Sequence, residues 1–350
     1  MSGTVPLVAD VADLTAPWLS AALGARVDAV TAAPVGTGQI GTCYRLTLTG
    51  DPSLPRTVLA KLPAIDPAAR AMLANPYRTE VRFYDEIAGT VAVRVPRTHH
   101  AAMAAEGGDF VLLLEDLAPA EQGDQIGGCT VEQATDAVVN LAGLHGPRWC
   151  DPALLDIEGL ALNGPEDAAL MAELFGPAVE LFLANLSDLL SAEDAATVRS
   201  IVPVIERWAL ARTERFGLVH GDYRLDNLLF PPDGGPGVVA VDWQTLSLAL
   251  PARDLAYVIA TSLDPEPRQA AEEALVGAYH QALLGYGVTS YSLENCWDDY
   301  RFALLQGPLV CVFGQAYGAR TERGDRMFAV MTARCCAAIR DLGTLALVGP

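Results

Sequence analysis

The sequence predicts an α+β fold of two lobes, a small β-rich lobe over residues 1–115 and a larger helical lobe over residues 116–350. The chain of 350 residues is 51% hydrophobic and 19% charged, which is enough apolar material for two cores at about 150 residues per domain. Short segments with alternating apolar residues dominate up to Leu114. Long segments with helical periodicity dominate after it, so we expect the boundary near residues 115–120.

The β-rich lobe is predicted to contain one small sheet and two helices. Residues 15–24 begin with a threonine cap and a proline in the first turn and end at Gly24, as a short helix does. Alternating apolar residues predict the strands, and a one-sided apolar pattern predicts the second helix. The predicted strands are the two ends of residues 27–48, residues 57–62, residues 91–98 and residues 110–114, and the second helix covers residues 76–88.

Helical periodicity dominates the second lobe. Its first predicted helix, residues 130–145, starts with a Thr-x-x-Gln capping box. Further helices are predicted over residues 167–190, over residues 191–215 and from Arg253 to the C-terminus. A loop over residues 216–230 and a very apolar strand over residues 238–241 interrupt them.

The composition argues against several classes of protein. The chain has 23 Lys and Arg against 43 Asp and Glu, a formal net charge of -20, which leaves little basic surface for the phosphates of a nucleic acid. It contains no run of 18 apolar residues, and its first 25 residues lack the charged start of a secretory signal. We therefore expect a cytoplasmic protein with no membrane and no nucleic-acid partner. Seven cysteines without a Cys-x-x-Cys pair indicate neither a disulfide framework nor a zinc site.

Three glycines, Gly36, Gly38 and Gly41, form a Gly-x-Gly-x-x-Gly string. Such a string can open a dinucleotide-binding helix, cover the phosphates of a nucleotide or belong to a plain hairpin. A dinucleotide-binding turn must lead into a helix, whereas residues 43–48 alternate as a strand does. The pattern therefore favours a β-turn-β flap over phosphates, with the plain hairpin as the alternative, and disfavours an oxidoreductase.

Lys61 is the only lysine of the chain, beside 22 arginines. It lies at the end of a predicted strand, and Glu80 follows 19 residues later on a predicted helix. In a phosphotransferase such a lysine bridges nucleotide phosphates and the helix glutamate orients it. Glu86 lies on another face of the same helix and is the weaker candidate partner. The plain alternative is a surface ion pair of little energetic worth.

The segment over residues 218–230 has the most specific pattern. Asp222 and Asn227 lie five residues apart in a predicted loop, and Asp242 ends an apolar strand 15 residues further on. A hairpin can bring the three side chains together, and carboxylate and amide oxygens are the ligands that Mg²⁺ prefers. With Asn227 and Asp242 on the metal, Asp222 is left to accept the proton of an acceptor hydroxyl. Ordinary turn chemistry is the alternative.

This pattern resembles a known signature. His220-Gly221-Asp222-x-x-x-x-Asn227 with Asp242 is similar to the motif of the aminoglycoside phosphotransferase and choline kinase superfamily, which has the protein-kinase-like fold. The large lobe is most similar to the ecdysteroid-kinase-like bacterial phosphotransferases. The similarity extends from about residue 27 to residue 261 and rests on three stretches: Leu114-Glu115-Asp116-Leu117, the His-Gly-Asp-Tyr-Arg-Leu-Asp-Asn string, and Asp242-Trp243-Gln244 leading to Asp254-Leu255-Ala256.

The resemblance implies a bilobal protein-kinase-like fold and ATP-dependent transfer of a phosphoryl group to a hydroxyl of a small molecule. It implies that Asp222 is the catalytic base and that Asn227 and Asp242 hold Mg²⁺. The other implied roles concern the nucleotide and the support of the loop. Lys61 with Glu80 would position the ATP phosphates, backbone groups near Glu115 and Leu117 would receive the adenine, His220 and Asp254 would brace the loop, and Arg224 would touch the transferred phosphate or pair with Asp226.

Three features bear on the acceptor and leave it open. Residues 116–350 carry 14 basic and 32 acidic residues, which would attract a cationic aminoglycoside or amino alcohol unless the acids only solvate helix surfaces. The apolar residues 300–319 could receive a hydroxylated lipid, steroid or acyl group, or belong to the core. Trp243-Gln244 follows the metal aspartate where drug-modifying relatives often have a small residue, which puts an aminoglycoside acceptor in doubt.

Two further classes are disfavoured. Only 12 residues separate Asp242 from Asp254, which is too short for the peptide-docking activation segment of a protein kinase. A catalytically inactive nucleotide-binding module is expected to have lost Lys61, Asp222 or Asp242, and all three are present. The sequence leaves the acceptor, the choice between ATP and GTP, and the oligomeric state open.

Overall fold

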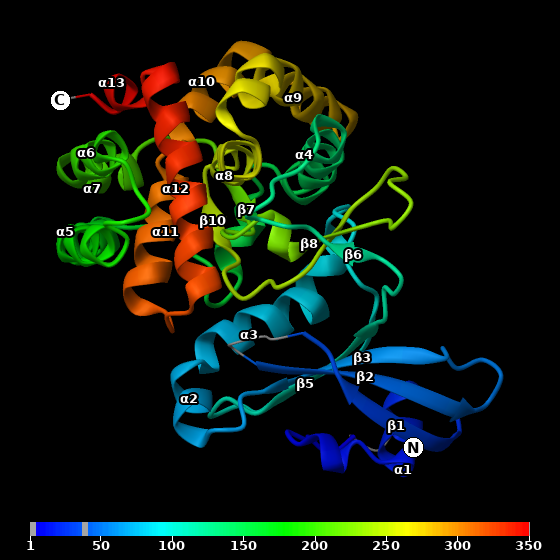
Figure 1. The fold of residues 1–350 in the computed structure, drawn as a ribbon. Helices are drawn as coiled ribbons and strands as arrows, with labels where there is room; N and C mark the ends of the chain where they lie inside the picture. The colour runs from blue at the N-terminus through cyan, green and yellow to red at the C-terminus, as the bar shows by residue number, and fades with distance from the viewer. Residues whose placement is uncertain (1–4, 37–40, 350) are drawn as a thin grey trace. The chain divides into compact units, whose positions relative to one another are not determined.

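The computed structural model describes residues 5–36 and 41–349 (Figure 1). The chain forms two compact units. The first comprises Met1–Thr90, Val95–Pro119 and Asp242–Thr245, and the second comprises Val91–Arg94, Ala120–Val241 and Leu246–Pro350. The short segment Asp242–Thr245 thus belongs to the first unit, although its neighbours on both sides in the sequence belong to the second.

A five-stranded antiparallel sheet with strand order β1-β2-β3-β5-β4 is the frame of the first unit. The strands are β1 (Val27–Pro34), β2 (Gly41–Gly50), β3 (Thr57–Pro63), β4 (Thr98–Met103) and β5 (Phe110–Glu115). Along β3 the side chains of Val58, Ala60 and Leu62 are buried in the hydrophobic core of this unit. Because successive side chains of a strand point to opposite faces, Lys61 lies on the other face of the sheet.

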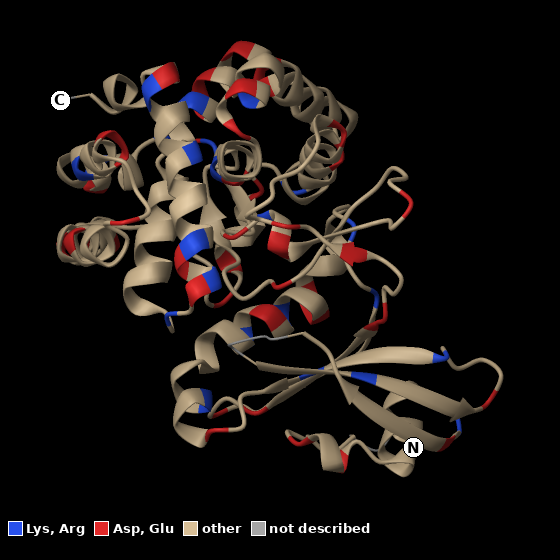
Figure 2. Ribbon diagram, in the orientation of Figure 1, with Lys and Arg blue, Asp and Glu red and all other residues tan. Residues whose placement is uncertain are grey.

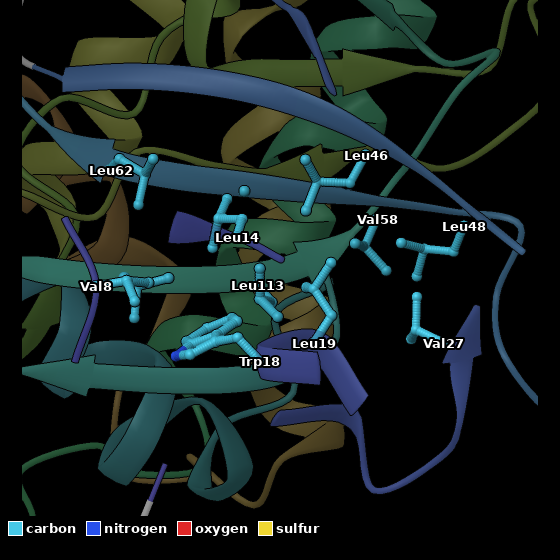
Figure 3. Packing of buried hydrophobic residues seen from close by; sticks show 12 residues of the cluster. Val8, Leu14, Trp18, Leu19, Val27, Leu46, Leu48, Val58, Leu62 and Leu113 are labelled. Atoms are coloured by element: carbon cyan, nitrogen blue, oxygen red, sulfur yellow. The ribbon is translucent and has the colours of Figure 1, made fainter. Parts of the chain in front are cut away.

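The core of the first unit forms where helix α1 (Ala16–Leu23) packs against the sheet (Figure 3). Thr15 caps this helix by accepting a hydrogen bond from the backbone N–H of Trp18, and the helix ends at Gly24 in the left-handed region, with φ of 67°. Trp18 and Leu19 of the helix are buried beside Leu113 of β5. The remaining core residues come mostly from the strands and from the N-terminal segment: Val8, Leu14, Val27, Leu46, Leu48, Val58, Ala60, Leu62 and Val111.

The first unit also contains α2 (Pro67–Met72), α3 (Ala74–Arg82), a π-helical turn η2 (Phe83–Ile87) and the 3-10 turns η1 (Val11–Asp13) and η3 (Ala88–Thr90). The predicted second helix is therefore present, with its last turns wound more loosely. Phe83 of η2 stacks on Trp243 with ring centroids 3.6 Å apart and planes at 7°. This stacking fixes the segment Asp242–Thr245 within the first unit.

The predicted strand over residues 91–98 is wrong, because β4 begins only at Thr98. The backbone N–H of Ala92 donates to Gly143 and that of Arg94 to the side chain of Asn140, so these groups are used in other contacts than a sheet ladder. Pro96 has no N–H to contribute to a ladder.

Helices make up most of the second unit (Figure 1). The capping box of the first is present, because Thr130 and Gln133 bond each other's backbone N–H through their side chains. The predicted helix over residues 191–215 is divided by a 3-10 turn, η5 (Val202–Val204), at Pro203. The helices are α4 (Val131–His145), α5 (Pro165–Asn185), α6 (Ala192–Ile201), α7 (Ile205–Leu210), α8 (Ala252–Ser262), α9 (Pro265–Gly285), α10 (Leu293–Ala303), α11 (Gln306–Tyr317), α12 (Glu322–Leu342) and α13 (Thr344–Val348), with a further 3-10 turn, η4 (Pro152–Asp156).

Short strands frame the predicted loop of the second unit. Strand β7 (Gly217–Val219) pairs with β10 (Ser247–Ala249), and β8 (Leu228–Phe230) pairs with β6 (Glu121–Gln122) and β9 (Val239–Ala240). The 3-10 turn η6 (Leu225–Asn227) leads directly into β8. Residues 220–227 are therefore held at both ends by backbone pairing.

Candidate active site

Lys61 and Glu80 form a buried ion pair in the first unit. The Lys61 Nζ atom donates to Glu80 Oε1 at 2.7 Å and to Asp242 Oδ1 at 3.2 Å. The side chains of Lys61 and Glu80 are 13% and 1% exposed, so this is no surface pair. Burial by itself would lower the pKa of Lys61, but the charges of Glu80 and Asp242 outweigh it and raise that pKa above its ordinary value. Lys61 is therefore a cation at neutral pH.

Glu86 is not the partner of Lys61. Its side chain is 58% exposed and lies 3.8 Å from Arg82 on the same helical segment. Glu80 is buried together with Tyr77 and Val81 on the inner side of α3. The geometry thus decides between the two glutamates in favour of Glu80.

The two residues after Asp242 hold this segment in the first unit. Trp243 is fully buried in its stack on Phe83. Gln244 is also buried, and its Nε2 donates to Glu80 Oε2 at 3.1 Å. The bulk at these positions therefore has a packing role in the first unit. Asp242 itself has φ of 67°, a conformation that costs a residue other than glycine roughly 1–2 kcal/mol.

Glycine is required at two of the three predicted glycine positions. Gly36 has φ of 74°, and a Cβ on Gly41 would lie 2.9 Å from the backbone oxygen of Leu62. Gly38 lies outside the described residues. Because Gly41 begins strand β2 and no helix follows the string, the dinucleotide-binding alternative fails.

The segment predicted to receive the adenine follows β5. The backbone N–H of Glu115 donates to Arg97 at 2.8 Å, and the Glu115 side chain accepts from the backbone N–H of Arg97. Asp116 forms a two-bond pair with Arg45, at 2.6 and 3.1 Å. Leu117 follows and is partly buried. Asp116 was not among the predicted site residues, although its ion pair with Arg45 holds the residue between Glu115 and Leu117 in place.

Asp222 lies in the second unit, where three side chains donate hydrogen bonds to its carboxylate. Arg224 Nε lies 3.0 Å from each carboxylate oxygen. The Tyr257 hydroxyl donates to Oδ1 at 2.8 Å, and Asn227 Nδ2 donates to Oδ2 at 2.9 Å. The Asp222 side chain is 23% exposed, so it is held in one orientation while remaining accessible.

Of the two alternatives predicted for Arg224, the structure contains the ion pair with Asp226, and contact with the transferred phosphate stays a prediction. Besides Asp222, its guanidinium pairs with Asp226 at 2.9 Å. Asp226 is itself held by the guanidinium of Arg323 on α12, at 3.0 and 3.1 Å, and by the backbone N–H of Gln125. Two arginines thus neutralise Asp226, and together with these hydrogen bonds they hold its pKa below the ordinary value although burial opposes them.

His220 and Asp254 brace the loop as the resemblance implies. The carboxylate of Asp254 accepts the backbone N–H of His220 at 2.6 Å and that of Gly221 at 3.0 Å. A ring nitrogen of His220 lies 3.1 Å from the backbone oxygen of Val241, whose N–H donates to Asn227. The loop and the residue before Asp242 are therefore linked within the second unit.

Several supporting residues carry no motif that identifies them from one sequence. Gln125 donates to the backbone oxygen of Thr261 and accepts the N–H of Leu225, and Gln122 donates to the backbone oxygen of Asp226. Tyr257 and Arg323 contact Asp222 and Asp226 from helices far along the chain. Only Tyr257 has a sequence signal, since it lies one helical turn after Asp254.

The apolar stretch over residues 300–319 is mainly core. Phe302, Leu304, Leu305 and Val312 are each at most 2% exposed.

Among the described residues, no helix is long and apolar enough to cross a membrane. The same described residues contain no cluster of three or more His, Cys, Asp or Glu side chains that could hold a metal ion.

Acidic residues of the second unit are interspersed with arginines along its helices (Figure 2). Several buried acids form ion pairs: Asp299 with Arg212 and Arg215, Glu272 with Arg268, and Asp194 with Arg340. Arginines therefore neutralise these buried acids, although the unit as a whole is strongly negative.

Solved structures with a similar fold are phosphotransferases. A choline kinase from Cryptosporidium parvum is 10% identical and covers 90% of this chain and 91% of its own, with a TM-score of 0.58. A spectinomycin phosphotransferase, solved with ADP and spectinomycin, is 12% identical. The match covers 92% of this chain and 97% of the spectinomycin phosphotransferase, with a TM-score of 0.52. At such low identity the likeness concerns the fold.

One curated protein shares a short segment with this chain. The acyl-CoA dehydrogenase family member 10 of Mus musculus is 41% identical over 68 residues. This match covers 18% of the present chain and 6% of the mouse protein. The chain therefore matches only a small part of that protein's length.

The β-sheet unit, the helical unit and their structural neighbours define an α+β protein with the kinase-like fold. The chain belongs to the phosphotransferase enzyme family, which matches it over residues 31–289, more than half of its length. It is thus a member of a phosphotransferase family, and the predicted superfamily is confirmed. The narrower similarity to ecdysteroid-kinase-like phosphotransferases stays a prediction.

Proposed function

We propose that this enzyme transfers the γ-phosphoryl group of ATP to a hydroxyl group of a small molecule. The observation that carries the proposal is the Asp222 carboxylate, oriented by three donors yet accessible. A carboxylate held in this way can accept a hydrogen bond from an alcohol and direct its oxygen in line with a phosphoryl group.

The proposed nucleotide site belongs to residues 1–115. Lys61, kept cationic by Glu80, contacts the phosphates, and the strand turn with Gly36, Gly38 and Gly41 covers them. Backbone groups at Glu115 and Leu117 receive the adenine. The close packing at Gly41 supports this role, because it lets β2 lie directly against β3 without side-chain bulk.

The proposed Mg²⁺ ligands are Asn227 and Asp242. Asn227 Nδ2 donates to both the backbone oxygen and the carboxylate of Asp222, so the amide is turned with Oδ1 as the atom for a cation. An amide oxygen and a carboxylate suit this hard ion, which usually retains water and phosphate oxygens as its other ligands. Mg²⁺, when bound, neutralises charge on the transferring phosphoryl group.

Residues 116–350 are proposed to contain the acceptor site. Asp222 orients the acceptor hydroxyl and takes its proton, and Arg224 stabilises the charge of the transferring group. The protein forms no covalent intermediate, so catalysis comes from positioning and charge neutralisation. Asp226, a second carboxylate of this loop, is already paired with two arginines, which favours an uncharged hydroxylated metabolite over a polycationic antibiotic.

An acceptor screen tests the function. The purified enzyme, Mg²⁺ and ATP are incubated with three panels: aminoglycosides and amino alcohols, sterols and lipid alcohols, and hydroxyacyl compounds. We expect an ATP-dependent mass gain of one phosphate in one of the uncharged panels. Phosphorylation of cationic compounds alone would contradict the acceptor class, and no transfer to any hydroxyl compound would contradict the proposed function.

A further inference from the structure

Tyr257 supports the carboxylate of Asp222 from outside the catalytic loop. Arg224 and Asn227, the other two donors, belong to the loop itself. Tyr257 lies on α8, 35 residues further along the chain, and its hydroxyl donates to Oδ1 at 2.8 Å. It is the one of the three donors that itself lies on a helix.

Helix α8 gives Tyr257 a rigid base. All residues from Ala252 to Ser262 are buried, and Tyr257 is only 1% exposed. The Thr261 hydroxyl donates to the backbone oxygen of Tyr257 at 2.6 Å. A buried phenol on a packed helix has little freedom to move. Its hydroxyl therefore restricts the orientation of the Asp222 carboxylate to which it donates.

The same helix also holds the backbone of the loop. Asp254, one turn before Tyr257, accepts the N–H groups of His220 and Gly221, the two residues that precede Asp222. Asp254 and Tyr257 lie three residues apart on one face of the helix. Asp254 binds the backbone of the loop, and Tyr257 binds the carboxylate of Asp222.

The phenol of Tyr257 is a hydrogen-bond donor at neutral pH. Burial raises the pKa of Tyr257 well above its ordinary value, and the nearby charge of Asp222 acts in the same direction. The hydroxyl therefore remains protonated and can only donate to a carboxylate.

The structure assigns to Tyr257 the role of a positioning residue that sets the rotation of the Asp222 carboxylate for the acceptor hydroxyl. This inference rests on the proposed function, in which Asp222 is the base. In this role Tyr257 acts on the reaction through its hydrogen bond to Asp222. Its loss should therefore lower kcat and leave the binding of Mg-ATP unchanged.

Tyr257→Phe tests the assignment, because it removes the hydroxyl and keeps the ring in its place. The matched control is Tyr300→Phe, since Tyr300 is also fully buried and donates to a carboxylate, Glu272, at 2.9 Å. We expect kcat of Tyr257→Phe to fall about 10- to 100-fold, as for other residues that orient a reacting group. KM for Mg-ATP should stay within about twofold, and Tyr300→Phe should retain wild-type kcat at a similar loss of thermal stability.

The outcomes separate this inference from the function itself. A wild-type enzyme without phosphoryl transfer would refute the proposed function. An active wild type with kcat of Tyr257→Phe within about twofold of it, or an equal fall of kcat in Tyr300→Phe, would overturn the role of Tyr257 alone. If Tyr257→Phe does not fold, Tyr257→Met is measured in its place against the same criteria. Failure of both variants to fold would assign Tyr257 a structural role and overturn the inference.

Discussion

Gln244 donates a hydrogen bond from Nε2 to Glu80 Oε2 at 3.1 Å, while the other oxygen of Glu80 accepts from Lys61 at 2.7 Å. Gln244 lies two residues after Asp242, which also contacts Lys61. Lys61 Nζ lies 2.7 Å from Oε2 as well, so the buried glutamate contacts both the cation and the segment that carries the proposed metal ligand. This arrangement couples the position of Asp242 to the lysine pair.

Gln244→Ala should weaken both stability and nucleotide binding. The substitution removes one of the two side chains that contact Oε2 of Glu80, a residue that is 1% exposed, and we expect a loss of about 1–3 kcal/mol in the free energy of unfolding. KM for Mg-ATP should rise because the segment that carries Asp242 loses its hydrogen bond to Glu80. Urea denaturation and steady-state kinetics measure the two effects.

Gln269→Ala is the control for this change, since Gln269 also donates to a carboxylate, Asp341, but at an exposed position. Its stability should stay within about 0.5 kcal/mol of the wild type. Equal stability losses in both variants would contradict the importance of the Glu80 contact.

Lys61 should be protected from amine reagents by nucleotide. It is the only lysine of the chain, so a reagent that acylates amines can modify only this side chain and the N-terminus. We expect slow modification of Lys61, because its raised pKa keeps it protonated, and still slower modification with Mg-ATP present. Peptide mass spectrometry follows the reaction, with the N-terminal amine as the internal control. Equal rates of Lys61 modification with and without saturating Mg-ATP would refute its contact with the phosphates.

Gly41→Ala should disturb the first unit. Its Cβ would lie 2.9 Å from the backbone oxygen of Leu62, so β2 and β3 must separate, and we expect a loss of about 1–3 kcal/mol in stability together with weaker binding of Mg-ATP. Gly277→Ala in helix α9 is the matched control, because nothing lies within 4 Å of the added Cβ there. That variant should be as stable as the wild type or up to about 1 kcal/mol more stable. Thermal unfolding of Gly41→Ala at the temperature of the control would show the predicted packing to be wrong.

Asp116 should make stability depend on pH in the acid range. Burial acts to raise its pKa, but the hydrogen bonds from Arg45, Ala118 and Thr57 outweigh this and hold the pKa below the ordinary 3.8. Its contribution to stability is therefore fully present above pH 3.8 and is lost as the pH falls through the lower pKa of the folded state. As the pH falls below 3.8, the wild type should lose stability faster than Asp116→Asn. Denaturation curves at several pH values measure this difference, and parallel curves for the two proteins would rule out the proposed linkage.

Local patterns predicted much of the fold because each rests on a few neighbouring residues. The Thr130 capping box, the helix ending at Gly24 and the alternation around Lys61 depend on spacing alone, and each is present. The failure at residues 91–98 has a different origin. Ala92 and Arg94 donate their backbone N–H groups to residues of α4, which an apolar pattern does not report.

The candidate site was predictable where its residues are adjacent in the sequence. Asp222, Arg224 and Asn227 lie in one loop, and the structure brings their side chains into contact. Arg323 and Gln244 contact this machinery through pairings that span many residues, and no local spacing encodes them. Tyr257 also makes such a long-range contact, and its only sequence signal is its position one helical turn after Asp254. The role of Trp243 also required the structure, since its stack on Phe83 joins residues 160 positions apart in the chain.

The most direct test of the account is kcat for Asp222→Asn with the identified acceptor, measured beside the dissociation constant for Mg-ATP. The amide keeps the shape and two acceptor lone pairs but cannot take a proton, so we expect kcat to fall about 10²- to 10⁴-fold. The dissociation constant for Mg-ATP should change less than about threefold, because the proposed phosphate contacts come from Lys61. A variant that retains wild-type kcat would contradict the assignment of Asp222 as the base.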